Sequence, residues 1–315
     1  MDASVQLPGS PDKCSHEYSP SDPAAKVGSL RKFPEIPVAT KDQTSPRVTC
    51  TSCVLREFCL PPGLSRDELA SAEHLVSTRL RIKRGSALYR SGDAFRSLYV
   101  VRVGSLKSTV ASDDAREQVT GFHLAGDMLG FDGLGAGSHA CDAVALEDTE
   151  VCVFPYCRIE EAAETMPSVR QHFYRLMSRE IVRKHASMLM LGSMDAGERL
   201  ATFLLDLSVR FELRGYSRTE FVLRMTRAEI GSFLGISLET VSRLMSQFTR
   251  DGVIDLTGVK QVKIVDPDRL RRLALGQQGD TRDRPQTCDA VGRRRAFVQA
   301  PAKTPPREAL VAEFA

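Results

Sequence analysis

The chain has 315 residues, of which 42% are hydrophobic, and a formal net charge of +3 at pH 7. This length predicts about two domains, and the small net charge excludes a polycation, so any nucleic-acid surface must be local. No apolar run reaches the roughly 18 residues of a membrane span, and the N-terminal MDASVQLPGSPDK does not resemble a signal peptide. We therefore expect a cytoplasmic protein that has no membrane partner. In that compartment its eight cysteines would serve metal or redox chemistry rather than structural disulfides.

Both ends of the chain are predicted to be disordered tails. Residues 1–47 are rich in Ser, Pro, Asp and Lys, and residues 276–315 are rich in Gly, Gln and Pro. The basic run at 293–295 is interpreted as part of a solvated tail rather than as a contact with DNA phosphates.

Residues 50–59 read CTSCVLREFC and place three cysteines in one short stretch. The spacing C-x2-C-x5-C lacks the second C-x2-C of a zinc ribbon, but it suits an iron–sulfur cluster that takes its fourth thiolate from elsewhere. A structural zinc or a thiol–disulfide switch is the alternative. The candidates for the fourth ligand are Cys14, Cys141, Cys152, Cys157 and Cys288.

The two candidates in the tails, Cys14 and Cys288, would be poor anchors. Cys152 lies on a predicted strand that would fix its position, although a cysteine there also fits a small buried residue. The spacing does not choose between Cys152 and Cys141.

From about 78 to 156 the chain consists of short β-branched or alternating segments broken by Gly and Asp. Strands at roughly ten-residue spacing predict a compact antiparallel barrel or roll. The pattern becomes helical from Met166 to about Leu191, and Pro155 and Pro167 flank this change, where proline suits a strand end and a helix start.

That helix carries a coiled-coil seam with steps of three and four residues, made of Tyr174, Met177, Ile181, Lys184, Met188 and Leu191. A two-fold dimer along the seam would present two recognition helices to a palindromic site. Lys184 interrupts the apolar seam, so we hypothesise that dimerisation is weak enough for a signal to switch it. The alternative is that Lys184 extends out of the seam into solvent.

The stretch MTRAEIGSFLGISLETVSRL predicts two short helices joined by a glycine turn, which is the helix-turn-helix pattern. Thr226 and Glu229 form a capping box for the first helix, Gly235 ends it and Ser237 caps the second. Two short strands, in GVIDL and QVKIV, would form a wing. The inward face of the second helix comprises Val241, Leu244, Met245 and Phe248.

The outward face of the second helix presents polar side chains near its N-terminal end, the end that a recognition helix inserts into the major groove. Arginine can bind guanine, glutamate can accept from cytosine, and serine can serve as either partner. These side chains are Glu239, Ser242, Arg243 and Ser246.

With these features together, the chain from about Cys50 to Leu275 resembles the cyclic-AMP receptor protein/FNR superfamily of bacterial transcription regulators. Within it the chain is most similar to FNR, the oxygen-sensing fumarate and nitrate reduction type. The stretches that carry the resemblance are CTSCVLREFC, SLYVVRVGSLKS, TGFHLAGDMLGFD, VCVFP, MPSVRQ, GERLATFL and MTRAEIGSFLGISLETVSRL.

The resemblance implies that a 4Fe–4S cluster is held by Cys50, Cys53, Cys59 and Cys152. It likewise implies that a TTGAT half-site and its inverted copy are read by Glu239, Ser242 and Arg243. Oxidation of the cluster would loosen the cysteine loop, favour the monomer and lower DNA affinity. The implied partners are palindromic double-stranded DNA, a second copy of the chain and RNA polymerase, in the control of anaerobic metabolism.

The expected fold is α+β, with an antiparallel β-roll, a long helix and a winged helix-turn-helix. Residues 48–165 would form the cysteine loop and the β-roll sensor domain, 166–194 the dimerisation helix and 195–275 the DNA-binding domain. The tails are 1–47 and 276–315.

Other functions find less support in the sequence. The stretch GDMLGFDGLGAGSHA lacks the arginine with which cyclic-AMP binders hold the phosphate. Haem sensing would leave the four cysteines without a purpose, and His123 and His139 are interpreted as structural residues of the roll. No G-x-S-x-G, P-loop or H-E-x-x-H motif is present, and no G-x-G-x-x-G follows a strand, so we expect no enzyme.

Overall fold

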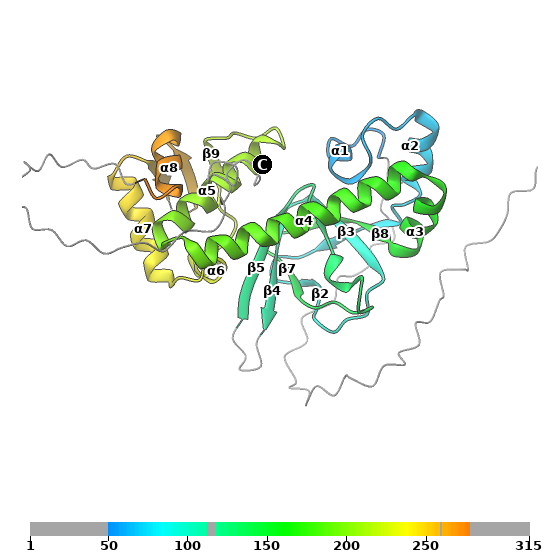
Figure 1. The fold of residues 1–315 in the computed structure, drawn as a ribbon, viewed down its shortest axis with the longest axis horizontal. Helices are drawn as coiled ribbons and strands as arrows, with labels where there is room; N and C mark the ends of the chain where they lie inside the picture. The colour runs from blue at the N-terminus through cyan, green and yellow to red at the C-terminus, as the bar shows by residue number, and fades with distance from the viewer. Residues whose placement is uncertain (1–49, 112–116, 259, 278–315) are drawn as a thin grey trace, which may run out of the picture. The chain divides into compact units, whose positions relative to one another are not determined.

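The computed structural model describes residues 50–111, 117–258 and 260–277 (Figure 1). The tail predicted at 1–47 and nearly all of the tail predicted at 276–315 therefore lie outside the described residues. The described chain falls into two compact units, one ending at residue 174 and the other beginning at 175 and also taking in 117–120. No helix in the described ranges is long and apolar enough to cross a membrane.

The first unit contains two four-stranded sheets, and every strand pairing assigned in them is antiparallel, which confirms the predicted roll. One sheet has the order β1-β8-β3-β6, made of Thr78–Ile82, Thr149–Pro155, Ser97–Val103 and Met128–Leu129. The other has the order β2-β7-β4-β5, made of Ala87–Tyr89, Asp142–Ala145, Ser105–Ala111 and Glu117–Leu124.

Strands β3 and β8 supply two different hydrophobic clusters because successive side chains of a strand point to opposite faces. Val101 and Val151 belong to the cluster of the roll interior, which also includes Ile82, Leu106 and Leu129. The opposite faces of the same strands contribute to the second cluster, which we call the outer cluster. Its buried members are Cys50, Leu60, Leu69, Ala72, Leu75, Val76, Leu98, Val100, Phe154, Ile159 and Val169.

Three short helices contribute to the outer cluster: α1 (Arg56–Cys59), α2 (Arg66–Glu73) and α3 (Tyr156–Thr165) (Figure 1). The sequence did not predict any of them. α3 follows Pro155 directly, so the change from strand to helix comes about ten residues earlier than the helical pattern indicated. Residues 131–133 form a single 3-10 turn, η2 (Phe131–Gly133).

The long helix α4 runs from Pro167 to Ser193, within one residue at each end of the predicted 166–194. Its first turn places Val169 in the outer cluster, with Phe173 packed against that cluster. The first turn of the helix is therefore anchored by the same hydrophobic residues that surround Cys50.

The second unit contains α5 (Ala196–Glu212), α6 (Arg227–Leu234), α7 (Leu238–Arg250) and α8 (Pro267–Ala274). A small antiparallel sheet has the order β10-β11-β9, made of Ile254–Thr257, Gln261–Ile264 and Glu220–Val222. The two wing strands are confirmed, and β9 adds a third strand that was not predicted.

The helix-turn-helix is built as its sequence predicts. Thr226 and Glu229 exchange both bonds of a capping box, and Gly235 ends α6 in the left-handed region at φ 64°. The Ser237 side chain accepts from the Thr240 amide to cap α7. Gly231 is also required, because a Cβ there would lie 2.6 Å from the Ile236 carbonyl oxygen.

The guanidinium of Arg199 on α5 joins three segments of the second unit. Its nitrogens donate to the backbone carbonyls of Leu191 at 2.8 Å, Met194 at 2.9 Å and Leu234 at 2.9 Å. Leu191 lies in the last turn of α4, and Leu234 is the last residue of α6. Carbonyls at helix ends have no intrahelical partner, so this one side chain satisfies the ends of two helices.

Several hydrogen-bonding groups surround the Asp132 carboxylate in the roll. Its Oδ2 accepts from the Ala140 amide at 2.9 Å and lies 3.4 Å from His139 Nδ1 and 3.5 Å from Cys141 Sγ. The His139 ring is buried and stacks on Tyr89 with centroids 3.7 Å apart. Burial raises the pKa of Asp132, but these hydrogen bonds outweigh it and bring the pKa to about 2.

Replacement of Asp132 by Asn is expected to lower the free energy of unfolding by about 2 kcal/mol near neutral pH. The folded pKa lies below the ordinary value of 3.8, so the stabilisation is present above that value and is lost as pH falls through about 2. Urea unfolding between pH 2 and 7 should show the two proteins converging at the acid end. Asp255→Asn, at an exposed position of β10, is the control and should change stability by less than about 0.5 kcal/mol. If the free energy of unfolding of D132N stayed below that of the wild type by the same amount across this pH range, the stabilisation could not be assigned to the ionised Asp132 carboxylate.

Candidate cysteine cluster and DNA-reading helix

The stretch 50–59 folds back on itself through tight backbone turns. The Cys53 amide donates to the Cys50 carbonyl at 3.1 Å, and the Arg56 amide donates to the Cys53 carbonyl at 3.1 Å. A single turn of helix, α1, then carries Cys59. The three thiols are thereby gathered on one small loop, with Cys50 buried and Cys53 and Cys59 partly exposed.

Glu73, the last residue of α2, fixes the start of this loop. Its Oε1 accepts from the amides of Cys50 at 2.9 Å and Thr51 at 3.0 Å, and from the Thr51 hydroxyl at 2.6 Å. The Thr51 hydroxyl and amide lower the pKa of Glu73, so the acceptor is ionised and these bonds are charge-assisted. Glu73 was not predicted from the sequence, because nothing in the spacing links it to a loop 22 residues away.

Phe58 fixes the middle of the loop against the turn at Gly126. A Cβ added to Gly126, whose φ is +90°, would lie 3.0 Å from Phe58 Cγ. The glycine of the HLAGD stretch is therefore needed twice, once for its backbone conformation and once for the close approach of the Phe58 ring.

Cys152 lies on β8, between β1 and β3, paired with Arg79 on one side and Val100 on the other. It packs against the outer cluster together with Cys59, and Cys50 is a member of that cluster. Cys141 packs instead against the roll interior. The structure thus brings the cysteine loop and Cys152 to the same face of the sheet and leaves Cys141 on the other.

Burial and neighbouring cysteines raise the pKa of Cys50, Cys59 and Cys152. Burial, followed by the charges of Cys152, Glu73 and Cys53, raises the pKa of Cys50 to about 11. Burial and the neighbouring cysteines likewise raise the pKa of Cys59, and burial raises that of Cys152. In each of these three thiols the charge of Cys53 adds to the rise of the pKa, as expected if Cys53 lies near them.

Among the residues that the structure describes, no three Cys, His, Asp or Glu side chains lie close enough to hold one metal ion. Thiolates around a single zinc must each lie about 2.3 Å from it. An iron–sulfur cluster is larger and spaces its four cysteine ligands farther apart. Cys50, Cys53, Cys59 and Cys152 supply the four thiolates that such a cluster needs.

The second helix of the helix-turn-helix, α7, has its apolar face buried and its polar face exposed, as predicted. Val241, Met245 and Phe248 are buried, and Leu244 is partly buried. The opposite face is exposed and comprises Glu239, Ser242, Arg243 and Ser246. The Glu239 backbone amide and the Ser237 hydroxyl lower the pKa of Glu239, which therefore stays ionised as an acceptor.

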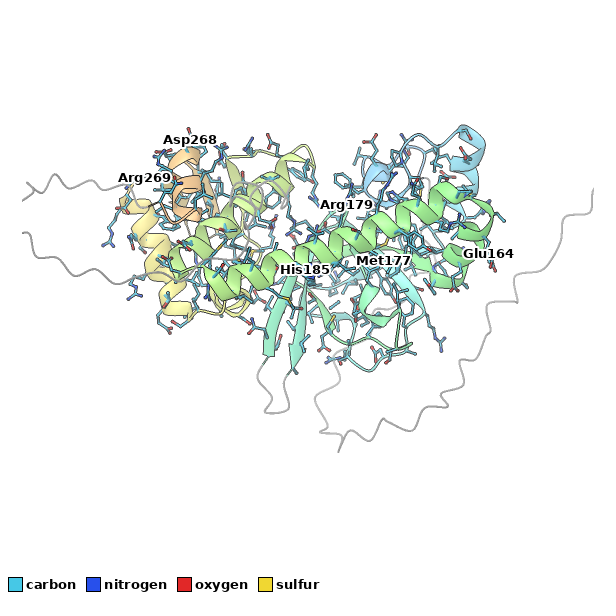
Figure 2. All side chains as sticks on the ribbon, viewed as in Figure 1. Glu164, Met177, Arg179, His185, Asp268 and Arg269 are labelled. Carbon is cyan, nitrogen blue, oxygen red and sulfur yellow. The ribbon has the colours of Figure 1, made fainter. Side chains whose placement is uncertain are left out.

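Most of the predicted seam on α4 is exposed. Tyr174, Ile181 and Met188 expose 61%, 54% and 69% of their surface, and Leu191 is also exposed. Met177, labelled on α4 with Arg179 and His185 in Figure 2, is partly buried. Lys184 is engaged rather than free, because its Nζ lies 3.3 Å from Glu180 Oε1 and 3.1 Å from the Thr120 carbonyl oxygen.

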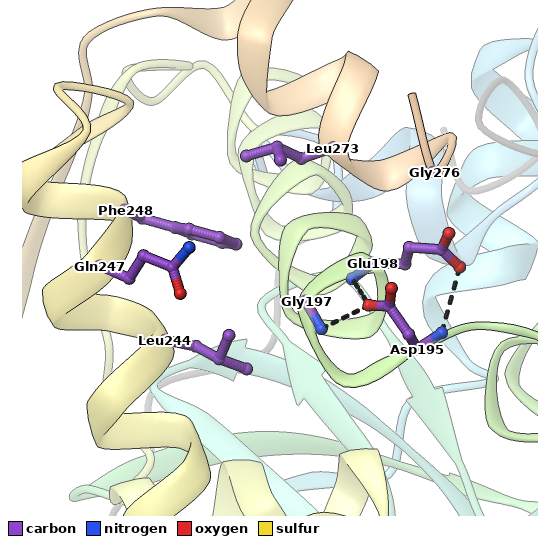
Figure 3. Close-up of a pocket in the computed structure, with 8 residues that line it drawn as sticks. All are labelled: Asp195, Gly197, Glu198, Leu244, Gln247, Phe248, Leu273 and Gly276. Atoms are coloured by element: carbon purple, nitrogen blue, oxygen red, sulfur yellow. Dashed lines mark hydrogen bonds between the residues drawn. The ribbon is translucent and has the colours of Figure 1, made fainter. Parts of the chain in front are cut away.

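A small pocket in the second unit lies beside the N-terminus of α5 (Figure 3). Its carboxylates are already engaged, since Asp195 accepts from the amides of Gly197 and Glu198, and Glu198 accepts from the Asp195 amide. The rest of its lining is Leu244, Gln247, Phe248, Leu273 and Gly276. We assign it to helix capping and packing.

Comparison with known families gives two matches along the chain. Residues 79–166 match the cyclic nucleotide-binding domain, and residues 198–273 match the Crp-like helix-turn-helix domain. The first match covers the strands of the roll and helix α3.

Individual proteins are similar over nearly their whole length. The transcriptional regulatory protein btr of Bordetella pertussis is 45% identical over 229 residues, which are 73% of this chain and 94% of that protein. The transcriptional activator protein anr of Pseudomonas aeruginosa is 41% identical over 75% of this chain and 97% of its own. The fumarate and nitrate reduction regulatory protein of Escherichia coli K12 is 40% identical over 72% of this chain and 90% of that protein.

Among solved structures, FixK2 from Bradyrhizobium japonicum superposes with a TM-score of 0.59 at 32% identity. The match covers 63% of this chain and 98% of FixK2.

Replacement of Glu73 by Ala is expected to release the start of the cysteine loop. Losing bonds to a charged acceptor costs about 1.5–3 kcal/mol, so the amides of Cys50 and Thr51 should exchange with solvent at least about tenfold faster. Hydrogen exchange measured by mass spectrometry on peptides that span 50–60 would show this.

The matched control is Glu68→Ala on the same helix, because the Glu68 carboxylate accepts from the amide and the hydroxyl of Ser65 at the N-terminus of α2. Equal exchange at Cys50 and Thr51 in the two variants would contradict the role of Glu73.

Proposed function

The chain belongs to the CRP/FNR family of DNA-binding transcription regulators and is not an enzyme, and from this we propose that it is an FNR-type regulator whose DNA binding depends on a 4Fe–4S cluster. The signal would be dioxygen, and the genes it controls would be those of anaerobic metabolism. The names of two relatives, an activator and a fumarate and nitrate reduction regulator, support this proposal.

The proposed ligands are Cys50, Cys53, Cys59 and Cys152. The observation that carries the proposal is that Cys50 and Cys59 of the loop and Cys152 of β8 lie at the outer cluster, while the charge of Cys53 raises the pKa of all three. A bound 4Fe–4S cluster would supply the redox chemistry toward dioxygen. The placement of Cys141 in the other hydrophobic cluster favours Cys152 as the remote ligand.

The protein's contribution is to connect the cysteine loop to α4. With all four thiolates ligated, the loop is tied to a central strand of the sheet. When ligation is lost, the loop is held mainly by Glu73 and by Phe58. Cys50 and Val169 are members of one hydrophobic cluster, so loosening the loop also loosens the first turn of α4.

We propose that α4 forms the interface of a homodimer and that α7 reads DNA. Exposed apolar side chains spaced along one helix indicate a surface that a second copy would cover. A two-fold dimer would place two copies of Glu239, Ser242 and Arg243 on a palindrome with TTGAT half-sites, where arginine suits the guanine and glutamate the cytosine. A monomer would lose half of these contacts. We also propose that the DNA-bound protein contacts RNA polymerase.

The test is anaerobic purification followed by a visible absorption spectrum and by iron and sulfide analysis, before and after exposure to air. We expect a brown protein with about four irons per chain that bleaches in air and simultaneously loses its affinity for a TTGAT palindrome. Cys152→Ser should abolish iron retention, whereas Cys141→Ser, the matched control, should retain it.

Arg243→Ala should keep the cluster but lose DNA binding, which separates the two functions. A colourless protein that carries zinc and binds DNA equally well in air would overturn the sensor and leave the regulator.

Lys184→Leu tests whether the seam is deliberately weak. If the charge at this seam position opposes pairing, the substitution should lower the dimer dissociation constant by at least about tenfold, or about 1.4 kcal/mol. Analytical ultracentrifugation of the anaerobic and the air-exposed protein would measure it.

Arg179→Leu is the control, because Arg179 is exposed on α4 but lies off the seam. An unchanged dissociation constant in Lys184→Leu would show that the bonds to Glu180 and Thr120 already remove this charge from the interface.

A further inference from the structure

Arg79 on β1 lies directly opposite Cys152 on β8. Residues opposite each other in an antiparallel pair share one face of the sheet, so its guanidinium lies on the face where the cysteines gather. Only 12% of the Arg79 side chain is exposed. By charge, and by a hydrogen bond with the thiol, Arg79 lowers the pKa of Cys152, opposing the larger effect of burial. It also opposes the rise in the pKa of Cys50.

The obvious acidic partner of Arg79 is shared with two other arginines. The Oε1 atom of Glu150 accepts a hydrogen bond from Arg102 Nη1 at 2.6 Å, and its Oε2 atom accepts one from Arg81 Nε at 3.4 Å. Arg79 Nε lies 3.9 Å from Glu150 Oε1, too far for a hydrogen bond. That buried Nε has no hydrogen-bond partner among the residues that the structure describes.

A buried guanidinium is costly unless an anion faces it. While the cysteines are neutral thiols, the ion pair of Arg79 with Glu150 is long and shared with Arg81 and Arg102, and the Cys152 thiol carries no charge. Four cysteine thiolates around an iron–sulfur cluster would place negative charge on this face. Arg79 would then gain the anion and the acceptor that it lacks, which is a physical reason for an arginine at this register position.

We infer, on the basis of the cluster proposed above, that Arg79 is a positioning residue for that cluster. Its guanidinium would donate a hydrogen bond to the Cys152 thiolate and stabilise the more reduced, more negative state of the cluster. Hydrogen bonds to the sulfurs and nearby charge are among the factors that set the potentials of such clusters. Removing the positive charge should therefore lower the reduction potential, so that the cluster loses an electron to dioxygen more readily.

The experiment compares Arg79→Gln with Arg81→Gln in the anaerobically loaded full chain. Arg81 is the matched control because it lies on the same strand and also binds Glu150, but it is exposed and lies opposite Glu150 rather than a cysteine. Spectroelectrochemical titration should show a roughly tenfold shift of the equilibrium toward the oxidised form in Arg79→Gln, equivalent to about 59 mV for one electron. The half-life of the cluster in air should shorten in the same variant, while Arg81→Gln should match the wild type.

Arg79→Lys keeps the test decisive if Arg79→Gln does not fold or retain iron. Lysine preserves the charge but loses the Nε donor, so a shift of roughly threefold in the same direction, about 28 mV, is expected relative to Arg81→Lys. Equal potentials in the paired variants of an iron-loaded protein would overturn the role of Arg79 and leave the cluster standing. A wild-type protein that holds no cluster under anaerobic conditions would overturn both.

Discussion

The pairing of β8 between β1 and β3 is the constraint on which the cysteine site depends. It holds Cys152 in a hydrogen-bonded sheet, while Cys50, Cys53 and Cys59 lie on a ten-residue loop fixed by a few side chains. The site therefore joins a rigid element to a weakly held one. Strands in the core of a sheet open only with large free energies, whereas short loops open easily, so any change at the thiols would be expressed mainly in the loop.

The same hydrophobic cluster that receives the loop also receives the start of α4. Packed interiors transmit displacement because they contain few voids that could absorb it. A shift of the buried Cys50 must therefore be accommodated by its neighbours, which include Val169 and Phe154. This gives the proposed coupling between cysteine ligation and the dimer helix a route through van der Waals contacts, without any polar relay.

Features of the fold could be predicted from the sequence where the residues that determine them lie close together along the chain. The capping box at Thr226, the turn at Gly235 and the faces of α7 follow from residues within four positions of each other, and all were predicted. Helix α1 is a single turn and has no periodic pattern, whereas α2 and α3 are at least as long as α6 and were missed although Ser65 and Glu68 form a capping box at the start of α2. Glu73 and Arg79 were missed for a different reason: their importance arises from a folded loop and a strand register, which spacing along the chain does not reveal.

The three carbonyls bound by Arg199 have a mechanical consequence. By joining the end of α4 to the end of α6, the guanidinium makes that joint stiff, so that torsion of α4 reaches the helix-turn-helix instead of being absorbed at residues 194–195. One inserted base pair rotates a half-site by about 35° around the duplex axis. In the proposed dimer, two helix-turn-helix units on stiff joints could follow such a rotation only slightly, so the spacing between the half-sites would matter for binding as much as their sequence.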